Sequence, residues 1–559
     1  MRKYSVSISR RSVNRLLFGF FLLLPIIGQG QAWQWGRMGG TNIGNSTSRA
    51  VVTDVYGNVY ISGNFYGGSI VFGTDTVYGG TPAIGDGTFL VKYGPMGNIL
   101  WAKNLGNSSG DEMSMAVDVS GNVYLAGEFV TSTLILGGDT LLNDSGVSSS
   151  LYIAKVNGSG SVIWARRPIA PDTSVTWANS INVDDAGNVY LEGVFGGGWV
   201  VFGTDTLINP NPSIFTYNIF LAKYDGSGNA IWGRQGTMGT TAGGGNVATD
   251  KLGDVFMGGY YSGPTIVFGA DTLTNSGRSV SFLVKYSPSG NELWAKGIKG
   301  GIYGLAADRS GNVIAGGAFL DTLIVGSDIL ISTDTTSGNA FVAKFGPLGI
   351  PIWARSATGT SEVNSVAVDD SGNTFITGNF DSTFSIGPYS LPDAGNADIF
   401  LAKYSDTGKA IWAIRNGGSG DEVPLCVTTD SSGTNIFIAG FCDSTVLIFG
   451  GDALDCSGNS YGHVFLAKLN SAGSLAVPSE FSESMVSVYP NPTHDNLAIS
   501  TTKTVTNVTI NDRVGTTIFN EGFNQGSVNV SVGSLPAGMY LVTVTDSDGA
   551  KTVRKIVKE

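Results

Sequence analysis

The sequence is poor in charged residues, in histidine and in cysteine. Of its 559 residues, 14% are charged, three are Cys and two are His. His494 lies near the C-terminus, and His463 has no nucleophile-elbow sequence beside it, which argues against a Ser-His-Asp triad. The Cys spacing matches no zinc-binding pattern. We therefore expect no metal, no cofactor and no nucleophilic active site.

Basic residues are outnumbered by acidic ones. Residues 32–485 contain 21 Lys and Arg against 38 Asp and Glu, a formal net charge of −17. Nucleic acids are bound through cations that neutralise their phosphates. We therefore exclude nucleic acid as a partner.

The apolar run near the N-terminus, Leu16–Gly28, is too short to span a membrane. It has 13 residues, follows five basic residues and precedes the small residues Gly30 and Ala32. A spanning helix needs about 20 apolar residues, whereas a secretory signal has this shorter pattern. We predict a signal peptide over residues 1–31 and no transmembrane anchor in the mature chain.

The chain is rich in glycine, with 81 residues, and it contains a long repeat. The repeated unit reads A-V-D-x-S-G-N-V-Y-x-x-G-x-F, then F-G-x-D-T-L, then F-L-A-K-Y-x-x-x-G-N-x-x-W-A. A long fixed period is the signature of a repeat architecture. The first Asp of the unit recurs 58 to 66 residues apart, at Asp54, Asp118, Asp184, Asp250, Asp308, Asp369 and Asp430.

Each unit carries four strand signals joined by Gly-containing turns, and radially repeated four-stranded sheets form a propeller. The Trp of the fourth strand recurs only six times before the seventh unit, which has Leu475 in its place. The segment around Trp35 supplies the missing strand. We predict an all-β chain whose residues 32–470 form a seven-bladed β-propeller, closed by pairing of this N-terminal strand with Phe465–Lys468.

The repeated Asp is accompanied by a Lys in the third strand of every unit. First and third strands of one sheet lie about 10 Å apart, a distance that a Lys side chain spans. We predict an ion pair within each blade, such as Asp369 with Lys403. The Lys residues are Lys92, Lys155, Lys223, Lys285, Lys344, Lys403 and Lys468.

All three Cys lie in the seventh unit. Cys442 and Cys456 flank a short hairpin and could form a disulfide in an oxidising, exported setting. Cys426 would then remain as a buried apolar residue.

The pattern ends after the seventh unit. Residues 471–485 are rich in Ser, Ala and Gly and are predicted to be a linker. Residues 486–559 show short alternating strands with regular turn signals, which predict a small C-terminal β-sandwich.

Several motifs of this last segment occur in a family-specific order. The segment resembles the C-terminal sorting domain of the type IX secretion system of Bacteroidetes. The resemblance implies the type IX secretion machinery as a partner of residues 486–559 and a location outside the cell or on the outer-membrane surface. The motif residues are Tyr489, Pro490, Asn491, Pro492, Gly538, Tyr540 and Lys555.

The repeats, through stretches such as residues 365–378 and 400–404, are similar to the bacterial β-propeller repeat called SBBP. That family shares a shape and no common chemistry, so function must be sought in residues that depart from the repeat.

The predicted ligand site uses such residues on one face of the ring. Carboxylates beside aromatic rings would suit a saccharide or a cation. Alternatively, the aromatic residues only pack loops and the carboxylates are solvated. The residues are Asp111, Glu112, Trp177, Trp199, Tyr303, Glu362, Asp421 and Glu422.

Two functions follow from this site. The preferred one is a non-enzymatic binding or scaffold protein for a glycan or a protein ligand. The alternative is a hydrolase or lyase acting on polysaccharides, with carboxylates such as Asp111 and Glu362 as acid and base; such pairs lie about 5 to 9.5 Å apart in glycosidases.

Overall fold

The computed structural model describes most of the chain outside the predicted signal and linker. Every regular element in the described ranges is a β-strand. These residues form two compact units, 31–471 and 487–559. The described ranges are 31–41, 44–79, 87–105, 114–143, 149–171, 174–211, 216–237, 242–275, 280–332, 338–443, 446–457, 462–471, 487–512, 516–547 and 551–559.

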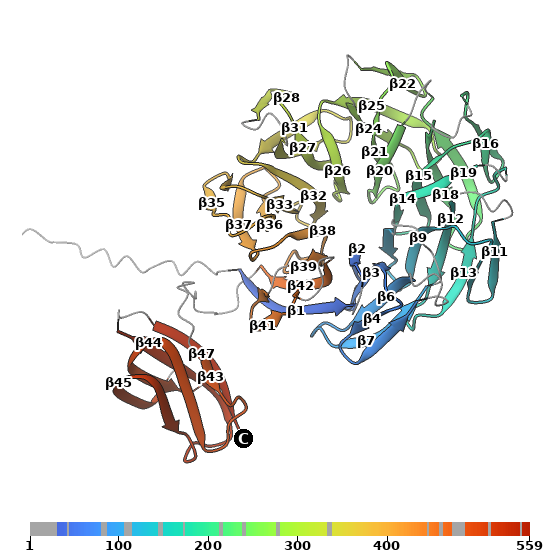
Figure 1. Cartoon of the computed structure of the whole chain (residues 1–559). Coiled ribbons are helices and arrows are strands. Elements are labelled where there is room, and N and C mark those ends of the chain that lie inside the picture. The colour runs from blue at the N-terminus through green and yellow to red at the C-terminus, as the bar shows by residue number, and fades with distance from the viewer. Residues whose placement is uncertain are drawn as a thin grey trace, which may run out of the picture. The chain divides into compact units, whose positions relative to one another are not determined.

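The first unit contains seven antiparallel sheets among its described residues, one for each sequence repeat: six have four strands, and the seventh has four strands extended by the hairpin β4–β5. In Figure 1 they stand around a common centre. The first strand of each sheet is innermost, and a small two-stranded hairpin lies at the outer edge. The repeat therefore specifies a propeller-like ring.

The strands of the seven sheets are listed here from the first strand outwards. Sheet 1 has β2 (Ser46–Thr53), β3 (Val59–Phe65), β6 (Gly87–Tyr93) and β7 (Ile99–Asn104); sheet 2 has β8 (Ser114–Val117), β9 (Val123–Phe129), β12 (Ser150–Val156) and β13 (Val162–Arg166); sheet 3 has β14 (Thr176–Val183), β15 (Val189–Phe195), β18 (Asn218–Tyr224) and β19 (Ala230–Gln235); sheet 4 has β20 (Ala242–Thr249), β21 (Val255–Tyr261), β24 (Val280–Tyr286) and β25 (Glu292–Ile298). Sheet 5 has β26 (Gly301–Ala307), β27 (Val313–Phe319), β30 (Asn339–Phe345) and β31 (Pro351–Ser356); sheet 6 has β32 (Ser361–Val368), β33 (Thr374–Phe380), β36 (Asp398–Tyr404) and β37 (Ala410–Asn416); sheet 7 has β38 (Glu422–Thr429), β39 (Asn435–Cys442), β42 (His463–Asn470) and β1 (Ala32–Gly40). The small hairpins are β4 (Ser69–Phe72) with β5 (Asp75–Tyr78), β10 (Thr133–Leu136) with β11 (Asp139–Leu142), β16 (Trp199–Phe202) with β17 (Asp205–Ile208), β22 (Thr265–Phe268) with β23 (Asp271–Thr274), β28 (Thr322–Val325) with β29 (Asp328–Ile331), β34 (Phe384–Ile386) with β35 (Tyr389–Leu391) and β40 (Leu447–Phe449) with β41 (Asp452–Leu454).

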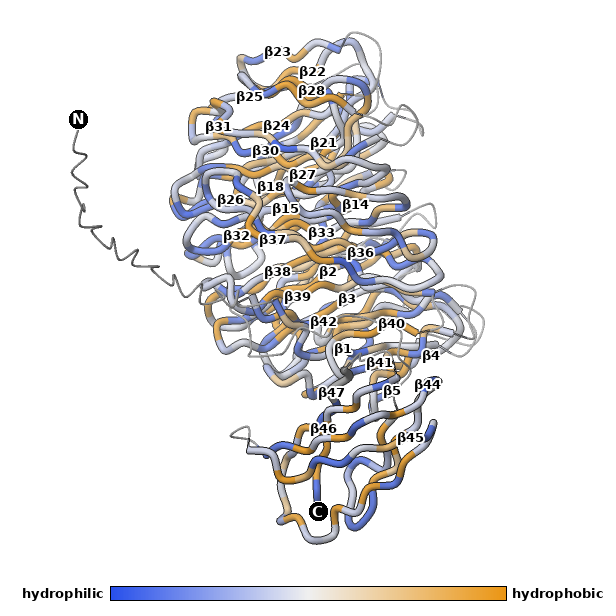
Figure 2. Tube along the Cα trace, turned by 90° about the vertical axis from the view of Figure 1, so that its left-hand side faces the viewer, coloured by the Kyte–Doolittle hydropathy of each residue, from blue (hydrophilic) through white to orange (hydrophobic). Residues whose placement is uncertain are grey.

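The core of the ring lies between neighbouring sheets. The second strands are buried on both faces, and β3 and β15 have no residue that reaches solvent appreciably. Figure 2 shows hydrophobic segments along strands such as β33 and β39. Sheets that are apolar on both sides must be covered on both sides, which the ring achieves with the sheet before and the sheet after.

The repeated Asp shapes the turn between the first two strands of a sheet. In sheet 5, Asp308 Oδ1 accepts hydrogen bonds from the backbone N–H groups of Ser310 and Asn312, at 2.9 and 3.0 Å. Its Oδ2 accepts from the side chain of Asn312 at 2.7 Å. Gly311 has a φ of 79°, which favours Gly. This geometry explains the motif D-x-S-G-N.

The repeated Trp and Lys join one sheet to the next. Trp101 Nε1 and Lys92 Nζ of sheet 1 both donate to the carbonyl oxygen of Gly158 in sheet 2, at 3.2 and 3.1 Å. Trp164 Nε1 of sheet 2 donates to the equivalent carbonyl oxygen, that of Gly226 in sheet 3, at 3.2 Å. Trp232, Trp294 and Trp353 repeat this hydrogen bond to the following sheet. These contacts between sheets were not anticipated from the sequence.

The predicted Asp–Lys ion pairs form in five sheets. Their Nζ to Oδ2 distances run from 2.8 Å for Lys344 with Asp308 to 3.8 Å for Lys92 with Asp54. The pairs of sheets 2, 4 and 6 lie between these limits. Lys223 and Lys468 instead donate to the carbonyl groups of Pro288 and Pro95 in the following sheet, at 3.0 and 3.1 Å. The repeated Lys therefore serves the junction between sheets as well as its own sheet.

The N-terminal strand β1 closes the ring. It is antiparallel to β42, with Trp35 opposite Lys468 and Met38 opposite Phe465, which confirms the predicted pairing. Arg37 then makes the contacts of its counterparts in other sheets: its Nη1 lies 2.8 Å from Asp452, and its Nε donates to Gly97 of sheet 1 at 2.7 Å. The strand from the start of the chain thus reproduces a regular junction.

A disulfide joins Cys442 to Cys456, with their Cα atoms 5.9 Å apart. Both Cys are completely buried, and Cys426 is a buried free thiol. The disulfide ties the end of β39 to the segment after the small hairpin of sheet 7, the sheet that receives β1.

Replacing Cys442 and Cys456 together by Ala is expected to lower the free energy of unfolding by about 2–4 kcal/mol, because the cross-link restricts the unfolded chain. Urea denaturation measures this loss. The matched variant Cys426→Ala keeps the cross-link and should lose clearly less. Equal losses in both variants would contradict a stabilising role for the disulfide.

The second unit is a five-stranded sheet in the order β43 (Ser487–Tyr489), β44 (Asn496–Asn511), β46 (Gly538–Asp546) and β47 (Lys551–Lys558), with β45 (Thr517–Ser531) also paired to β44. All five strands share one hydrogen-bonded network, in which the long strands β44 and β45 shift register. Val508, Val530 and Val542 belong to its separate apolar core. A sandwich would have two separate sheets, whereas the described strands of this unit are connected in one.

The sorting-motif residues come together at one end of this sheet. The side chain of Asn491 donates to the carbonyl of Lys555 at 3.0 Å and accepts from the N–H of Val557 at 2.8 Å. Tyr540 donates its hydroxyl hydrogen to the carbonyl of Pro536 at 2.8 Å. The motif at residues 489–492 is therefore held by the last strand of the chain.

Candidate functional site

The innermost strands share an irregularity that creates a central site. In six of the seven sheets, the described first strand skips one or two residues in its pairing with the second strand, which is a β-bulge. Bulges re-aim side chains and are frequent beside functional sites. The skipped residues are Arg49, Asn179, Gly244 with Gly245, Tyr303, Asn364 and Leu425.

Bulge residues from five sheets line one cavity of about 310 Å³ at the centre of the ring. This volume is at the lower end of the roughly 300–1,000 Å³ typical of ligand sites. Apart from Arg49, its lining is uncharged, with amide and hydroxyl groups next to apolar side chains. The lining residues are Arg49, Ala50, Val51, Ser114, Met115, Asn179, Ser180, Asn246, Tyr303, Asn364, Ser365, Leu425, Cys426 and Val427.

Hydrogen bonds between neighbouring first strands hold this lining in place. The hydroxyl oxygen of Ser180 accepts from the N–H of Val247 in the next sheet at 3.1 Å, and Ser365 accepts from Val427 in the same way. Asn246 donates its side-chain N–H to the carbonyl of Tyr303 at 2.9 Å. Because these bonds run from sheet to sheet, the site is preorganised by the ring itself.

Tyr303 and Glu362 are neighbours at the junction of sheets 5 and 6. Burial raises the pKa of Glu362, and a hydrogen bond from Asn379 partly offsets this shift. Burial and the Glu362 carboxylate also raise the pKa of Tyr303. Asn379 in turn accepts a hydrogen bond from Asn364 at 2.9 Å. Asn379 therefore links the Glu362 carboxylate to the cavity lining.

The raised pKa of Glu362 gives a pH prediction. As pH rises from the ordinary Glu value of about 4.3 through the raised folded value, the unfolded chain loses its proton first, so the ring loses stability. Glu362→Gln removes that loss. The variant should melt at a higher temperature than the parent at pH 8 and at the same temperature near pH 4. The exposed Asp381→Asn serves as control, and an equal shift at both pH values would contradict the prediction.

Three predicted aromatic residues have different positions. Tyr303 lines the cavity and is 45% exposed. Trp177 packs against Tyr217, the residue before β18, with ring centroids 4.7 Å apart. Trp199 begins β16 in the outer hairpin of sheet 3, far from the centre in Figure 1. Of the three, only Tyr303 contributes to the site.

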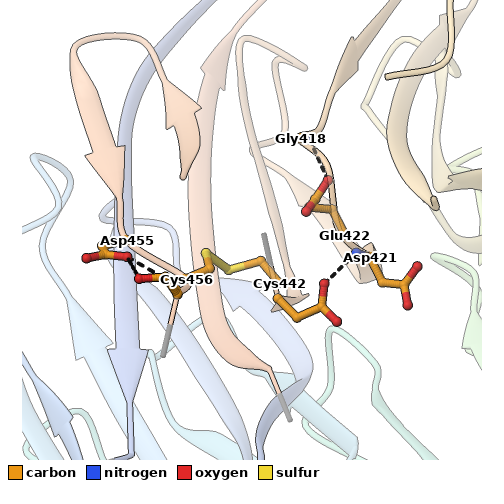
Figure 3. The surroundings of a disulfide bond; sticks show 8 residues. Gly418, Asp421, Glu422, Cys442, Asp455 and Cys456 are labelled. Carbon is orange, nitrogen blue, oxygen red and sulfur yellow. Dashed lines mark hydrogen bonds between the residues drawn. A yellow bond between two sulfur atoms is a disulfide. The ribbon is translucent and has the colours of Figure 1, made fainter. Parts of the chain in front are cut away.

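The predicted carboxylates that belong to the described residues lie at sheets 6 and 7. Asp111 and Glu112 lie outside the described residues. Glu422 is completely buried and accepts a hydrogen bond from the N–H of Gly418 at 2.6 Å. Asp421 accepts from the N–H of Ala397 at 3.3 Å. Figure 3 shows Glu422 in the same sheet as the disulfide, with its carboxylate at the N–H of Gly418.

Arg49, Asn179, Asn364 and Leu425 were missed in the sequence. Each lies five residues before the repeated Asp of its unit, as Tyr303 does. Within a strand whose other positions repeat, this position changes from Arg to Asn, Gly, Tyr and Leu. An alignment of the seven units that scored variability by position would have found it.

Among the described residues, no group of three or more His, Cys, Asp or Glu is placed to hold a metal ion. The described part of the chain also contains no helix long and apolar enough to cross a membrane.

Residues 487–559 match the family described as the secretion system C-terminal sorting domain. This match confirms the type IX sorting tail predicted from the motifs. The tail implies interaction with the type IX machinery and delivery to the cell surface or the extracellular space.

Three known proteins show more distant similarity. An uncharacterised WD repeat-containing protein of Acanthamoeba polyphaga mimivirus is 25% identical over 436 residues, covering 63% of this chain and 31% of that protein. An endo-acting ulvan lyase of Formosa agariphila is 39% identical over 75 residues, 13% of this chain and 14% of the lyase. The β-propeller domain of the Trilobed protease from Pyrococcus furiosus has a TM-score of 0.37 at 5% identity, covering 74% of this chain and 96% of that domain. The chain thus spans less than a third of the length of the two curated relatives.

Proposed function

We propose that this chain is an exported, non-enzymatic binding protein whose central cavity binds a glycan at the cell surface or in the extracellular space. The observation that carries the proposal is the set of bulge residues around the cavity. A purely architectural position would repeat in every sheet, as the Asp and the Trp do. Side chains that change from sheet to sheet while pointing to one centre support a ligand site.

The chemistry of the lining favours a glycan over a protein ligand. The side-chain N–H groups of Asn179, Asn246 and Asn364 already donate within the ring, and their amide oxygens can accept hydrogen bonds from the hydroxyl groups of a sugar. Tyr303 and Leu425 add apolar surface for the faces of a sugar ring. The cavity is enclosed by seven strands and is too small for a folded partner, whereas one or two sugar residues match its scale.

Finer assignments accompany this proposal. We infer seven blades from the seven sheets and the closing strand β1, an SBBP-type repeat from the recurring motifs, a Bacteroidetes origin from the sorting motifs, and a sandwich-like fold for the tail. A signal peptide over residues 1–31 would carry the chain through the inner membrane before the tail directs it across the outer one.

A glycan array probed with the full mature chain tests the binding function, and incubation with the polysaccharides that bind tests for cleavage. We expect selective binding to a family of related saccharides and no change in their chain length. An empty array would overturn glycan binding, and shortened products would overturn the non-enzymatic assignment.

The second candidate, a polysaccharide lyase or hydrolase, is favoured by one observation: Glu362 with its raised pKa lies beside Tyr303. A buried carboxyl group and a phenol could exchange protons with a sugar. If the digests show cleavage, Glu362→Gln should reduce kcat at least about 100-fold. Full activity of that variant would remove Glu362 from the reaction.

A further inference from the structure

The cavity contains an arginine that differs from the other described arginines of the ring. Arg49 is the bulge residue of β2, is exposed and has no hydrogen bond or ion pair to any described residue. By contrast, six other arginines each pair with an Asp: Arg309 pairs with Asp370, and the other five pairs have N to O distances of 2.8 to 3.4 Å. These are Arg37, Arg166, Arg234, Arg309, Arg355 and Arg415.

No described lining residue compensates the charge of Arg49 within the cavity. No Asp or Glu is among the described lining residues. The rest of the ring is strongly acidic, with 38 Asp and Glu against 21 Lys and Arg over residues 32–485. A cation in a cleft with low-dielectric walls concentrates the field on the space in front of it. The cavity is therefore suited to receive a negative group.

We propose that the ligand of the central cavity is a saccharide with an anionic substituent, a carboxylate or a sulfate, which Arg49 binds. This inference rests on the proposed glycan-binding function. The planar guanidinium offers paired N–H donors that match the oxygens of both substituents. The amide oxygens of Asn179, Asn246 and Asn364 then accept hydrogen bonds from hydroxyl groups of the same sugar. The acidic ring around the cavity disfavours polyanions such as nucleic acid, so a single anionic group at one point is selected.

Calorimetric titration of the full mature chain with three matched oligosaccharide probes tests this inference. The probes are a galactose disaccharide with one residue oxidised to galacturonate, the methyl ester of that disaccharide, and the parent disaccharide carrying one sulfate. The parent chain should bind at least one charged probe more tightly than the ester. Arg49→Gln should weaken that binding by about 10- to 100-fold, the size of a hydrogen bond to a charged group, while leaving the weaker binding of the ester unchanged. Which charged probe responds distinguishes carboxylate from sulfate recognition.

Two further variants guard against indirect effects. Arg49→Lys keeps the charge but loses the paired donors, so its affinity should be intermediate. Arg309→Gln, an arginine at an exposed ion pair with Asp370, should bind all probes as the parent does. Because Arg49 is exposed, all variants should melt at the parental temperature.

The outcomes separate this inference from the function on which it rests. If the ester binds as tightly as the charged probes and Arg49→Gln changes nothing, anion recognition is wrong while glycan binding stands. If the parent binds neither charged probe, anion recognition is also wrong, and the glycan array decides whether any glycan is bound.

Discussion

Removing residues 32–40 from the mature chain is expected to lower the free energy of unfolding of the ring by more than about 5 kcal/mol. The deletion breaks seven backbone pairs between β1 and β42, each worth about 0.5–1.5 kcal/mol. It also exposes the apolar surface that Trp35 buries. Urea denaturation followed by tryptophan fluorescence measures the loss, together with any loss of cooperativity.

The substitution Gly39→Ala tests the same closure without shortening the chain. A Cβ atom on Gly39 would lie 2.1 Å from Cε1 of Phe72, which belongs to β4 at the junction with sheet 1. Overpacking of this kind reduces stability by about 1–3 kcal/mol. Gly451→Ala is the matched control in the same region, because a Cβ there has open space around it. A truncated chain that unfolds like the parent would contradict closure by β1.

Asp308→Ala is expected to lower the free energy of unfolding by about 3–5 kcal/mol, the usual effect of breaking a buried ion pair from one side. Asp308 is 4% exposed, and its partner Lys344 is 1% exposed and would keep only the exposed carboxylate of Asp406. The turn also loses its acceptor for two backbone N–H groups. Chemical denaturation of the purified variant measures this loss.

The pH dependence of Asp308 has a definite sign. Burial alone would raise the pKa of Asp308, but hydrogen bonds from Lys344 and Asn312 outweigh it and the pKa is lowered. Its contribution to stability is therefore present above the ordinary Asp value of about 3.9 and is lost as pH falls through the lower folded value. The difference between parent and Asp308→Ala should shrink at that acid end.

A matched control is available in sheet 3. Asp225 makes the same turn contacts, accepting from the N–H groups of Ser227 and Asn229 at 2.9 Å, but it is partly exposed and forms no ion pair with a described Lys. Asp225→Ala should therefore lose less than half as much stability as Asp308→Ala. Similar losses at both positions would show that the turn, and not the buried pair, carries the effect.

The ring could be predicted from the sequence because its determinants are local and repeated. The spacing of Asp308 and its equivalents gives the number of sheets, and the displaced Trp35 gives the closing strand. The turns follow from Asp and Gly in D-x-S-G-N, since both residues act within five positions of each other.

The site was harder to predict because its determinants are not local. Whether Arg49 or Asn364 points to the centre depends on a bulge, which exists only in the pairing of two strands. Trp199 lies in an outer hairpin and Glu422 begins an innermost strand, and both positions depend on strand pairing that the local sequence does not show. Aromatic and acidic residues stand out in the sequence, whereas a position that varies within a repeat stands out only after the units are superimposed.

A crystal structure of the mature chain with the strongest saccharide from the glycan array tests the central claim most directly. We predict electron density for the sugar inside the central cavity, in contact with Tyr303 and Asn364 and with an anionic substituent at Arg49. A sugar bound at the outer hairpins near Trp199, or no saccharide bound at all, would contradict the assignment of the central cavity as the binding site.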